Sequence, residues 1–270
     1  MTLSADVELA SSGLMAHERR EQIARLVDED HRVSVADLTA RFGVTDASIR
    51  RDLILLEGAG RLRRVHGGAV SLAAKLAGGV YANKLRLHRD EKARIAAAAA
   101  RLVSPGEIVL FDSGTTVAQV ASQMPPALRA PSAITVVTYS LPVVDEIGAW
   151  EAPHLVVVGG LYLPEYRSFV GPGTIESLRT LTADTIFLGC DGLTVESGLT
   201  TPHVLVAEVG SVATARSRRV VAVADSSKLG RQGFTTIVPL AEVDVLITDT
   251  AADPGRVAEI RDAGVEVILA

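Results

Sequence analysis

The sequence predicts two folded parts, an N-terminal winged helix-turn-helix and a C-terminal α/β domain with a largely parallel sheet. Two short amphipathic helices separated by a glycine-containing turn, followed by a segment rich in arginine and glycine, predict the first part. Continuous Val/Ile/Leu runs that alternate with helical segments predict the second, because the strands of a parallel sheet are buried on both faces. The 270 residues are enough for about two domains.

The helix-turn-helix follows from residues typical of helix starts and ends. Ser34 and Asp37 have the spacing with which a side chain satisfies free amides at a helix start. Gly43 suits a helix end, where a positive φ is needed. Thr45 then caps a second helix, and Asp46 stands at the positive end of its dipole.

The exposed polar face of the second helix lies near its N-terminus, where a recognition helix contacts base edges. The candidate DNA-binding residues of the helix pair are Ser34, which caps the first helix, and Thr45, Asp46, Ala47, Ser48, Arg50 and Arg51 at the start of the second. The segment after the helix predicts a wing along the phosphate backbone, with candidates Arg61, Arg63, Arg64, His66 and Gly67. Five arginines against two acidic residues between positions 50 and 64, in a chain of net charge −5, favour a localised contact with double-stranded DNA. The alternative is a three-helix packing module with a solvated basic face.

We expect residues 1–14 to be a flexible tail, 15–70 the winged helix-turn-helix, 71–84 a linker and 85–270 the α/β domain. One helix is predicted over 85–103. Apolar runs predict strands at 108–111, 134–138, 154–158, 185–188, 220–224, 243–248 and 265–269. Helices are predicted between them at 116–123, 142–147, 174–181, 205–216 and 256–263.

Small and polar residues follow several of these strands, and ligands of such sheets bind beyond the carboxyl ends of the strands. After the first strand, Ser113, Gly114, Thr115 and Thr116 open a helix whose amides and hydroxyls suit a phosphate, while Asp112 suits sugar hydroxyls. Gly159, Gly160, Asp191 and Lys228 follow other strands. An ordinary capped helix start and a solvated surface lysine are the alternatives for the first loop and for Lys228.

The run from Val44 to Leu53, the pair Leu56-Glu57 and the segment from Arg64 to Ala69 resemble the DeoR family of bacterial transcription regulators. The motifs D-S-G-T-T, V-V-T, V-G-G, S-F-V-G, G-L-T-T-P and D-S-S-K also occur in the family's order. The resemblance covers nearly the whole chain after about Met15.

The resemblance implies a sensor domain similar in fold to ribose-5-phosphate isomerase, with a phosphorylated sugar bound near the strand-end residues named above. Glu208 matches a recurring acidic family position, and an exposed helix charge is its alternative explanation. Two residues depart from the family pattern: Tyr139 and His203 stand where asparagine is common. We include Tyr139 among the effector-binding candidates.

These observations predict a cytoplasmic, DNA-binding transcription regulator, by resemblance a repressor of carbohydrate-metabolism genes, that responds to a phosphorylated sugar. We expect a homo-oligomer, a dimer or tetramer, because two recognition helices contact two half-sites. No catalytic residue, cofactor, metal or membrane contact is expected, and the single cysteine excludes an intramolecular disulfide. The alternatives are a sugar-phosphate isomerase-like enzyme with an appended DNA-binding module, and a scaffold that binds only protein.

Overall fold

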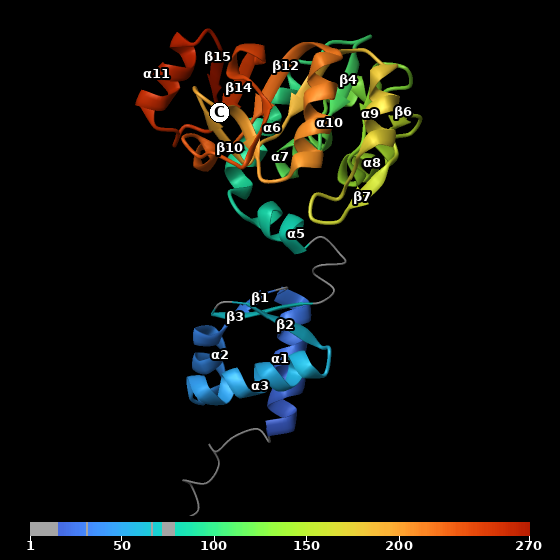
Figure 1. The fold of residues 1–270 in the computed structure, drawn as a ribbon. Helices are drawn as coiled ribbons and strands as arrows, with labels where there is room; N and C mark the ends of the chain where they lie inside the picture. The colour runs from blue at the N-terminus through green and yellow to red at the C-terminus, as the bar shows by residue number, and fades with distance from the viewer. Residues whose placement is uncertain (1–15, 31, 66, 72–78) are drawn as a thin grey trace, which may run out of the picture. The chain divides into compact units, whose positions relative to one another are not determined.

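The computed structural model describes residues 16–30, 32–65, 67–71 and 79–270 (Figure 1). The predicted tail 1–14, His66 and most of the predicted linker lie outside the described residues. Contacts divide the chain into two units, Met1–Val80 and Tyr81–Ala270. Buried residues form one hydrophobic core in the first unit and two in the second.

Three helices and a small sheet make up the N-terminal unit. Its elements are α1 (Ala16–Asp30), β1 (Arg32–Ser34), α2 (Val35–Phe42), α3 (Asp46–Gly58), β2 (Leu62–Val65) and β3 (Gly68–Ser71). The strands are antiparallel in the order β1-β3-β2, so β2 and β3 form the wing that the sequence predicts. The predicted caps are present: Ser34 accepts from the Asp37 amide at 3.0 Å, Thr45 accepts from the Ser48 amide at 3.3 Å, and Gly43 has φ 63°.

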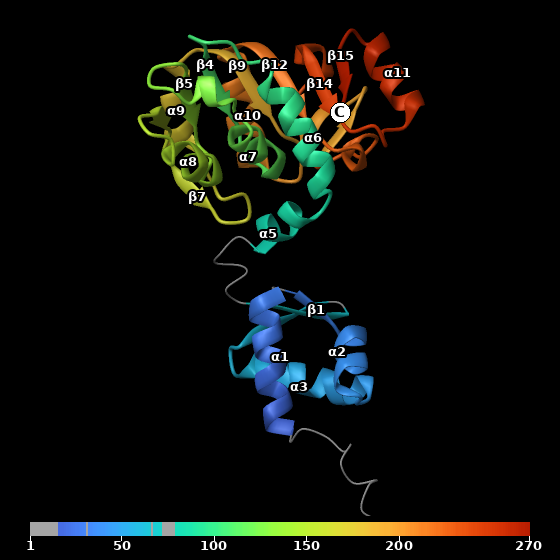
Figure 2. The same cartoon turned by 180° about the vertical axis from the view of Figure 1, so that it is seen from behind.

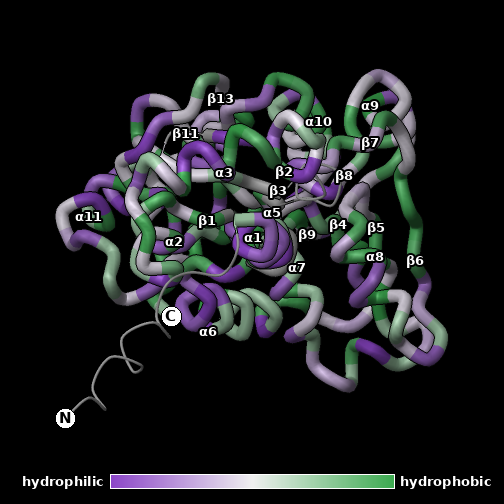
Figure 3. Tube along the Cα trace, turned by 90° about the horizontal axis from the view of Figure 1, so that it is seen from below, coloured by the Kyte–Doolittle hydropathy of each residue, from purple (hydrophilic) through white to green (hydrophobic). Residues whose placement is uncertain are grey.

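A buried carboxylate ties two helices of this unit together. Asp52 of α3 is only 3% exposed, and it accepts hydrogen bonds from Arg19 at 2.7 Å and Arg20 at 3.4 Å, both in α1. The rest of α1 is largely hydrophilic, as its purple colour in Figure 3 shows. A buried charge is tolerated because it is paired and hydrogen-bonded.

The C-terminal unit is built on a seven-stranded sheet in which every neighbouring pair is parallel. Its strands are β4 (Ile108–Phe111), β5 (Thr135–Thr138), β6 (His154–Val157), β9 (Ala183–Leu188), β12 (Ser217–Val223), β14 (Val245–Thr248) and β15 (Glu266–Leu269). The strand order is β15-β14-β12-β9-β4-β5-β6. The chain therefore extends the sheet from β4 in one direction and from β9 in the other.

Helices cover both faces of this sheet. One face carries α6 (Arg89–Ala100), α7 (Thr115–Ser122) and α8 (Leu141–Gly148), and the other carries α9 (Pro172–Arg179), α10 (Val204–Ala215) and α11 (Pro254–Asp262). Figure 1 shows α9 and α10 in front of the sheet, and Figure 2 shows α6, α7 and α8 in front of it. Each face buries its own aliphatic core, which explains the continuous apolar strands.

The fold class predicted from the sequence is confirmed, but three local features differ. The helix predicted over 85–103 is present as α6 but begins later, because α5 (Gly79–Arg86) is a separate helix and His88 between the two has a left-handed φ of 53°. The β7–β8 hairpin (Leu161–Leu163 and Ser168–Val170) was not predicted. Neither was the small sheet of β10 (Gly192–Thr194), β11 (Gly198–Thr201) and β13 (Thr235–Val238). Strands this short carry too few residues for a recognisable apolar pattern.

A substitution at Gly68 tests whether β3 of the wing packs against β1. A Cβ at this residue would lie 2.0 Å from the Val33 carbonyl oxygen on the neighbouring strand, whereas a Cβ on Gly58 in α3 would meet nothing. We expect Gly68→Ala to destabilise the N-terminal unit by roughly 1–3 kcal/mol, the usual cost of overpacking. Gly58→Ala is the matched control, which should stabilise the helix by up to about 1 kcal/mol. Hydrogen exchange of the α1 and α3 amides measures both effects, and equal exchange in the two variants would contradict the assignment of the wing.

Candidate functional site

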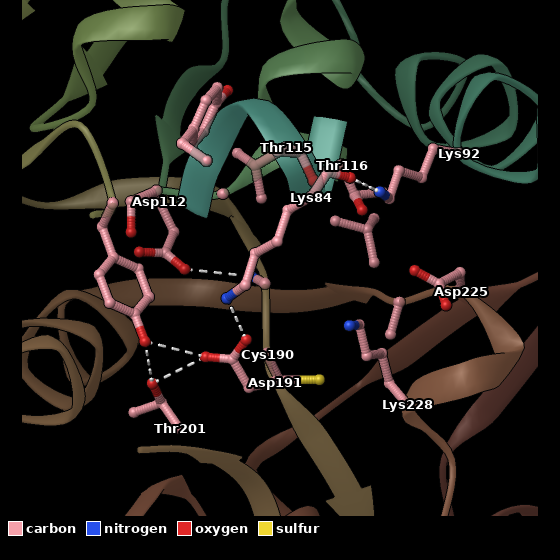
Figure 4. Close-up of a pocket in the computed structure, with 18 of the residues that line it drawn as sticks. Lys84, Lys92, Asp112, Thr115, Thr116, Cys190, Asp191, Thr201, Asp225 and Lys228 are labelled. Atoms are coloured by element: carbon pink, nitrogen blue, oxygen red, sulfur yellow. Dashed lines mark hydrogen bonds and ion pairs between the residues drawn. The ribbon is translucent and has the colours of Figure 1, made fainter. Parts of the chain in front are cut away.

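A cavity of about 210 Å³ opens at the carboxyl ends of β4, β9 and β12 (Figure 4). This is the edge at which the strand order reverses between β4 and β9, the usual ligand position in open α/β sheets. One buried water needs roughly 10–15 Å³, so the cavity has room for a small organic molecule. Among the described residues that line it are four basic side chains and four carboxylates: Lys84, Lys92, Lys228, Arg231, Asp112, Glu165, Asp191 and Asp225.

One wall of the cavity is the loop from β4 into α7. Gly114 is the N-cap of α7 with φ 122°, a backbone conformation that glycine adopts without strain. No side chain caps this helix start. Thr115 and Thr116 line the cavity in the first turn, so the start of α7, the positive end of the helix dipole, adjoins the cavity and suits an anion.

Behind this loop, the Asp112 carboxylate connects three strand ends. Its Oδ1 accepts the Tyr139 hydroxyl at 2.7 Å, from the end of β5, and its Oδ2 accepts the Gly189 amide at 3.1 Å, from the end of β9. Burial raises the pKa of Asp112 to about 6, although the hydrogen bonds from Tyr139, Ser113 and Gly189 each act to lower it. Burial also raises the pKa of Tyr139 well above its usual value, so this phenol stays protonated and donates.

A second carboxylate, Asp191, is the centre of a polar cluster across the cavity. It forms an ion pair with Lys84 of α5 and accepts hydroxyls from Thr201 at 3.0 Å and Tyr166 at 3.1 Å. Burial acts to raise the pKa of Asp191, but the Lys84 ammonium and the three hydrogen bonds prevail and lower it. Asp191 is therefore ionised and suited to ligand hydroxyls.

A third group lies on the other side of the cavity in Figure 4, where Lys92 and Lys228 stand near Asp225. Lys92 is 3% exposed and donates to two backbone carbonyls of the α5 end, those of Lys84 and Leu87, the latter at 2.5 Å. Burial lowers the pKa of Lys92. Asp225 accepts from the amide and hydroxyl of Ser227, which fixes the turn that presents Lys228.

Seven of the predicted effector-binding residues line this cavity: Asp112, Ser113, Gly114, Thr115, Thr116, Asp191 and Lys228. Tyr139 does not line it and instead supports Asp112 from the interior of the protein.

Gly159, Gly160 and Glu208 also lie outside the cavity lining. Gly160 has a packing role, because a Cβ there would lie 2.0 Å from the Thr174 hydroxyl. That hydroxyl donates to the Gly159 carbonyl at 3.0 Å. Glu208 is exposed on α10 beside a shallow surface depression.

The sequence did not single out Tyr81, Lys84, Lys92 or Tyr166, which the structure places in the cavity lining. The first two fall in the stretch predicted as a linker, where no pattern indicated a role. Thr201 belongs to the G-L-T-T-P motif, which was the one available signal. His203, the second departure from the family pattern, packs edge-on against Tyr166 with ring centroids 6.0 Å apart.

The candidate DNA-binding residues are grouped on α2, α3 and the wing. Arg50, Arg51, Arg61, Arg63 and Arg64 are all exposed. Three of them have acidic partners in the same unit: Arg50 with Asp46, Arg61 with Glu21 and Arg64 with Glu57. Within the described residues Arg51 and Arg63 have no ion pair, which leaves both guanidinium groups available to DNA.

Two further findings concern the described part of the chain only. It contains no group of three or more His, Cys, Asp or Glu side chains that could hold a metal ion. None of its helices has the length and hydrophobicity needed to cross a membrane. Cys190 lines the cavity, and burial raises the pKa of its thiol to about 12, so it is not a reactive thiolate.

Comparison with known proteins assigns a family model to each unit. Residues 19–75 match the DeoR-like helix-turn-helix domain, and residues 87–250 match the DeoR C terminal sensor domain.

The chain is also similar over nearly its whole length to named regulators. It is 35% identical over 255 residues to the HTH-type transcriptional regulator GlpR of Haloferax volcanii, covering 94% of this chain and 98% of the relative. It is 32% identical over 234 residues to the transcriptional repressor AccR of Agrobacterium fabrum, covering 86% and 89%. These relatives are named as regulators or repressors and not as enzymes, in agreement with the expectation from the sequence. The solved structure of ribose 5-phosphate isomerase A of Methanocaldococcus jannaschii aligns with 53% of this chain and with 55% of its own chain. The identity is 19% and the TM-score is 0.39, so the likeness is partial.

The Tyr139–Asp112 hydrogen bond has a measurable electrostatic consequence. The phenol stabilises the ionised carboxylate, so Tyr139→Phe should move the pKa of Asp112 above its value of about 6. The pKa of this carboxyl is higher in the folded chain than in the unfolded chain. The free energy of unfolding therefore falls as the pH rises from about 4 to about 6, by about 3 kcal/mol in total.

In Tyr139→Phe the loss of unfolding free energy should continue to a higher pH than in the wild type. Carboxyl NMR titration and unfolding free energies measured against pH test this. Tyr162→Phe, at an exposed tyrosine of β7, is the control. An unmoved Asp112 titration in Tyr139→Phe would show that the hydrogen bond has no electrostatic effect.

Proposed function

The chain belongs to the DeoR family of transcriptional regulators, and from this premise we propose that it represses carbohydrate-metabolism genes and that a phosphorylated sugar in the cavity modulates its binding to operator DNA. The cavity carries this proposal. Its uncapped helix start, with Lys228 and Lys92 nearby, suits a phosphate. Asp191, which is ionised, suits the hydroxyls of a sugar. A ligand with an anionic group and several hydroxyls complements both kinds of group at once.

The N-terminal unit supports the other half of the proposal. The start of α3, from Thr45 to Arg51, is the candidate for contacts with base edges, and the wing, from Arg61 to Gly67, is the candidate for the phosphate backbone. His66 of this wing lies outside the described residues. Ser34 caps α2 and helps to hold the first helix of the pair. A homodimer or tetramer would present two such units to two half-sites.

The competing function is sugar-phosphate isomerisation by the same cavity. The relatives disfavour it, since they are named as transcriptional regulators or repressors and not as enzymes. Incubation with ribose 5-phosphate separates the two functions: saturable binding without turnover supports the sensor, and turnover supports the enzyme.

For the DNA interface, we expect Arg50→Ala and Arg51→Ala to abolish specific operator binding while the sensor stays folded. Arg63→Ala should weaken binding to all sequences alike and reduce the slope of log affinity against log salt by about 1. Arg61→Ala should have a smaller effect, because Glu21 already holds that guanidinium.

Fluorescence anisotropy at several salt concentrations, with DNA from upstream of the chain's own and neighbouring genes, measures these effects. Arg179→Ala is the matched control, since Arg179 is an exposed helical arginine paired with Glu176. Undiminished operator affinity in Arg51→Ala would refute the assignment of α3.

For the cavity, we expect at least one member of a phosphosugar panel to bind and raise the melting temperature. The panel contains ribose 5-phosphate, fructose 1-phosphate, fructose 6-phosphate, glucose 6-phosphate and glycerol 3-phosphate. Lys228→Met should lower the affinity about tenfold or more, the usual effect of losing a charge-assisted hydrogen bond.

Arg218→Met, at an exposed arginine of β12, should bind as the wild type does. Calorimetry measures the affinities. Failure of every panel member to bind, or an unchanged affinity in Lys228→Met, would count against the proposed ligand site.

A further inference from the structure

Helix α5 contributes side chains to the cavity, although it lies in the chain directly after the segment that leads from the DNA-binding unit. Tyr81 and Lys84 both line the cavity, while its other walls come from the ends of the central strands. Their i, i+3 spacing puts them on one face of α5. Val80 and Leu85 are 49% and 40% exposed, so the buried face of α5 is the one that carries the two polar residues.

Tyr81 anchors α5, and its hydroxyl does not face the charged groups of the cavity. The side chain is 5% exposed, and the charges that act on its hydroxyl are those of Arg167, Glu146 and Asp145, none of which lines the cavity. The guanidinium carbon of Arg167 is 5.8 Å from the centre of the Tyr81 ring. Lys84 is therefore the side chain of α5 whose polar group can meet a ligand.

Lys84 has a partner that a ligand can replace. Its ammonium pairs with Oδ1 of Asp191, while the other oxygen of that carboxylate is held by Thr201 and Tyr166. Thr201 is 1% exposed and fixed in β11, whereas the Lys84 side chain is 34% exposed and comes from a helix outside the sheet. The Lys84 ammonium also lies 5.0 Å from the centre of the Tyr166 ring, which keeps it over the cavity. A phosphate or sugar oxygen would thus accept a hydrogen bond from the Lys84 ammonium in place of Asp191. A sugar hydroxyl would then donate to the released Oδ1 of Asp191.

The end of α5 is held by a second cavity residue. The Lys92 ammonium donates to the carbonyls of Lys84 and Leu87, and the chain then turns at His88 in a left-handed conformation. Lys92 and His88 both line the cavity. A ligand that approaches Lys92 consequently acts on the same helix end.

We propose that Lys84, which α5 places in the cavity lining, is a ligand-binding residue through which α5 responds to occupancy of the cavity. The proposal rests on the proposed function, because it takes this cavity as the phosphosugar site. A ligand oxygen accepts from the Lys84 ammonium, and α5 becomes more firmly held when the ligand is bound. Since α5 directly follows the segment from the DNA-binding unit, its ordering is the step that makes operator affinity depend on the ligand.

The test uses the full chain and the panel member that binds most tightly. In the wild type, saturating ligand should slow hydrogen exchange of the α5 amides. Lys84→Met should weaken ligand binding about tenfold or more. At ligand concentrations that saturate this variant, the α5 amides should show less protection, and operator affinity should no longer respond to ligand.

Two further variants separate a binding role from a structural one. Arg86→Met removes an exposed cation from the same helix, at a residue outside the cavity lining, and should behave as the wild type. Lys84→Arg keeps the charge and should restore part of the affinity lost in Lys84→Met. If Lys84→Met does not fold, Lys84→Gln decides the matter, because it removes the charge and keeps a polar side chain that can hydrogen-bond to Asp191.

The outcomes are distinct. Ligand binding with unchanged α5 exchange, or with wild-type affinity in Lys84→Met, overturns this inference and leaves the proposed function intact. If no panel member binds, the proposed function and this inference fail together. Weakened binding and loss of the operator response in Lys84→Met, with Arg86→Met unaffected, support it.

Discussion

The cavity depends on one buried carboxylate, that of Asp112, at the point where the order of the sheet reverses. Its two oxygens hold the ends of β5 and β9, through Tyr139 and Gly189, against the end of its own strand. Neighbouring strand ends diverge where such a sheet reverses, and a crevice results. Hydrogen bonds across it fix how far the strand ends are separated, and hence where the α7 helix start and Asp191 face one another.

The two carboxylates have opposite environments, and this difference gives the cavity two ends. Asp112 is fully enclosed, and burial raises its pKa. Asp191 has an ammonium and two hydroxyls around it, and these lower its pKa despite burial. One carboxylate is therefore structural and the other is available as a charged acceptor once Lys84 leaves it. Under the proposed function, a positive helix start at one side and an ionised carboxylate at the other would favour a phosphosugar over a simple anion, because a phosphosugar has a group for each.

The local parts of this structure could be predicted from the sequence, and the long-range parts could not. Helix caps such as Ser34 and Thr45 act within three residues, so their spacing alone revealed them. The strand–loop–helix pattern around Gly114 was equally local. Lys84 meets Asp191 across 107 residues of chain, and a lysine without an apolar pattern is by default solvated. Gly160 was predicted to bind the ligand because a glycine lets another group approach the backbone closely. The sequence could not show which group approaches, and in the fold it is the Thr174 side chain.

The polar groups around the cavity are not those that would make the fold most stable. Burial disfavours the charge of Lys92 and of Asp112, and the Tyr81 hydroxyl has no partner among the described residues. Apolar residues of similar volume would remove these unfavourable terms. Groups held in unfavourable environments concentrate where a protein binds ligands, since a ligand can supply the missing partners. Here the exchangeable ion pair of Lys84 belongs to α5. Under the proposal above, the free energy that a ligand gains by replacing this pair acts on the helix that follows the DNA-binding unit in the chain.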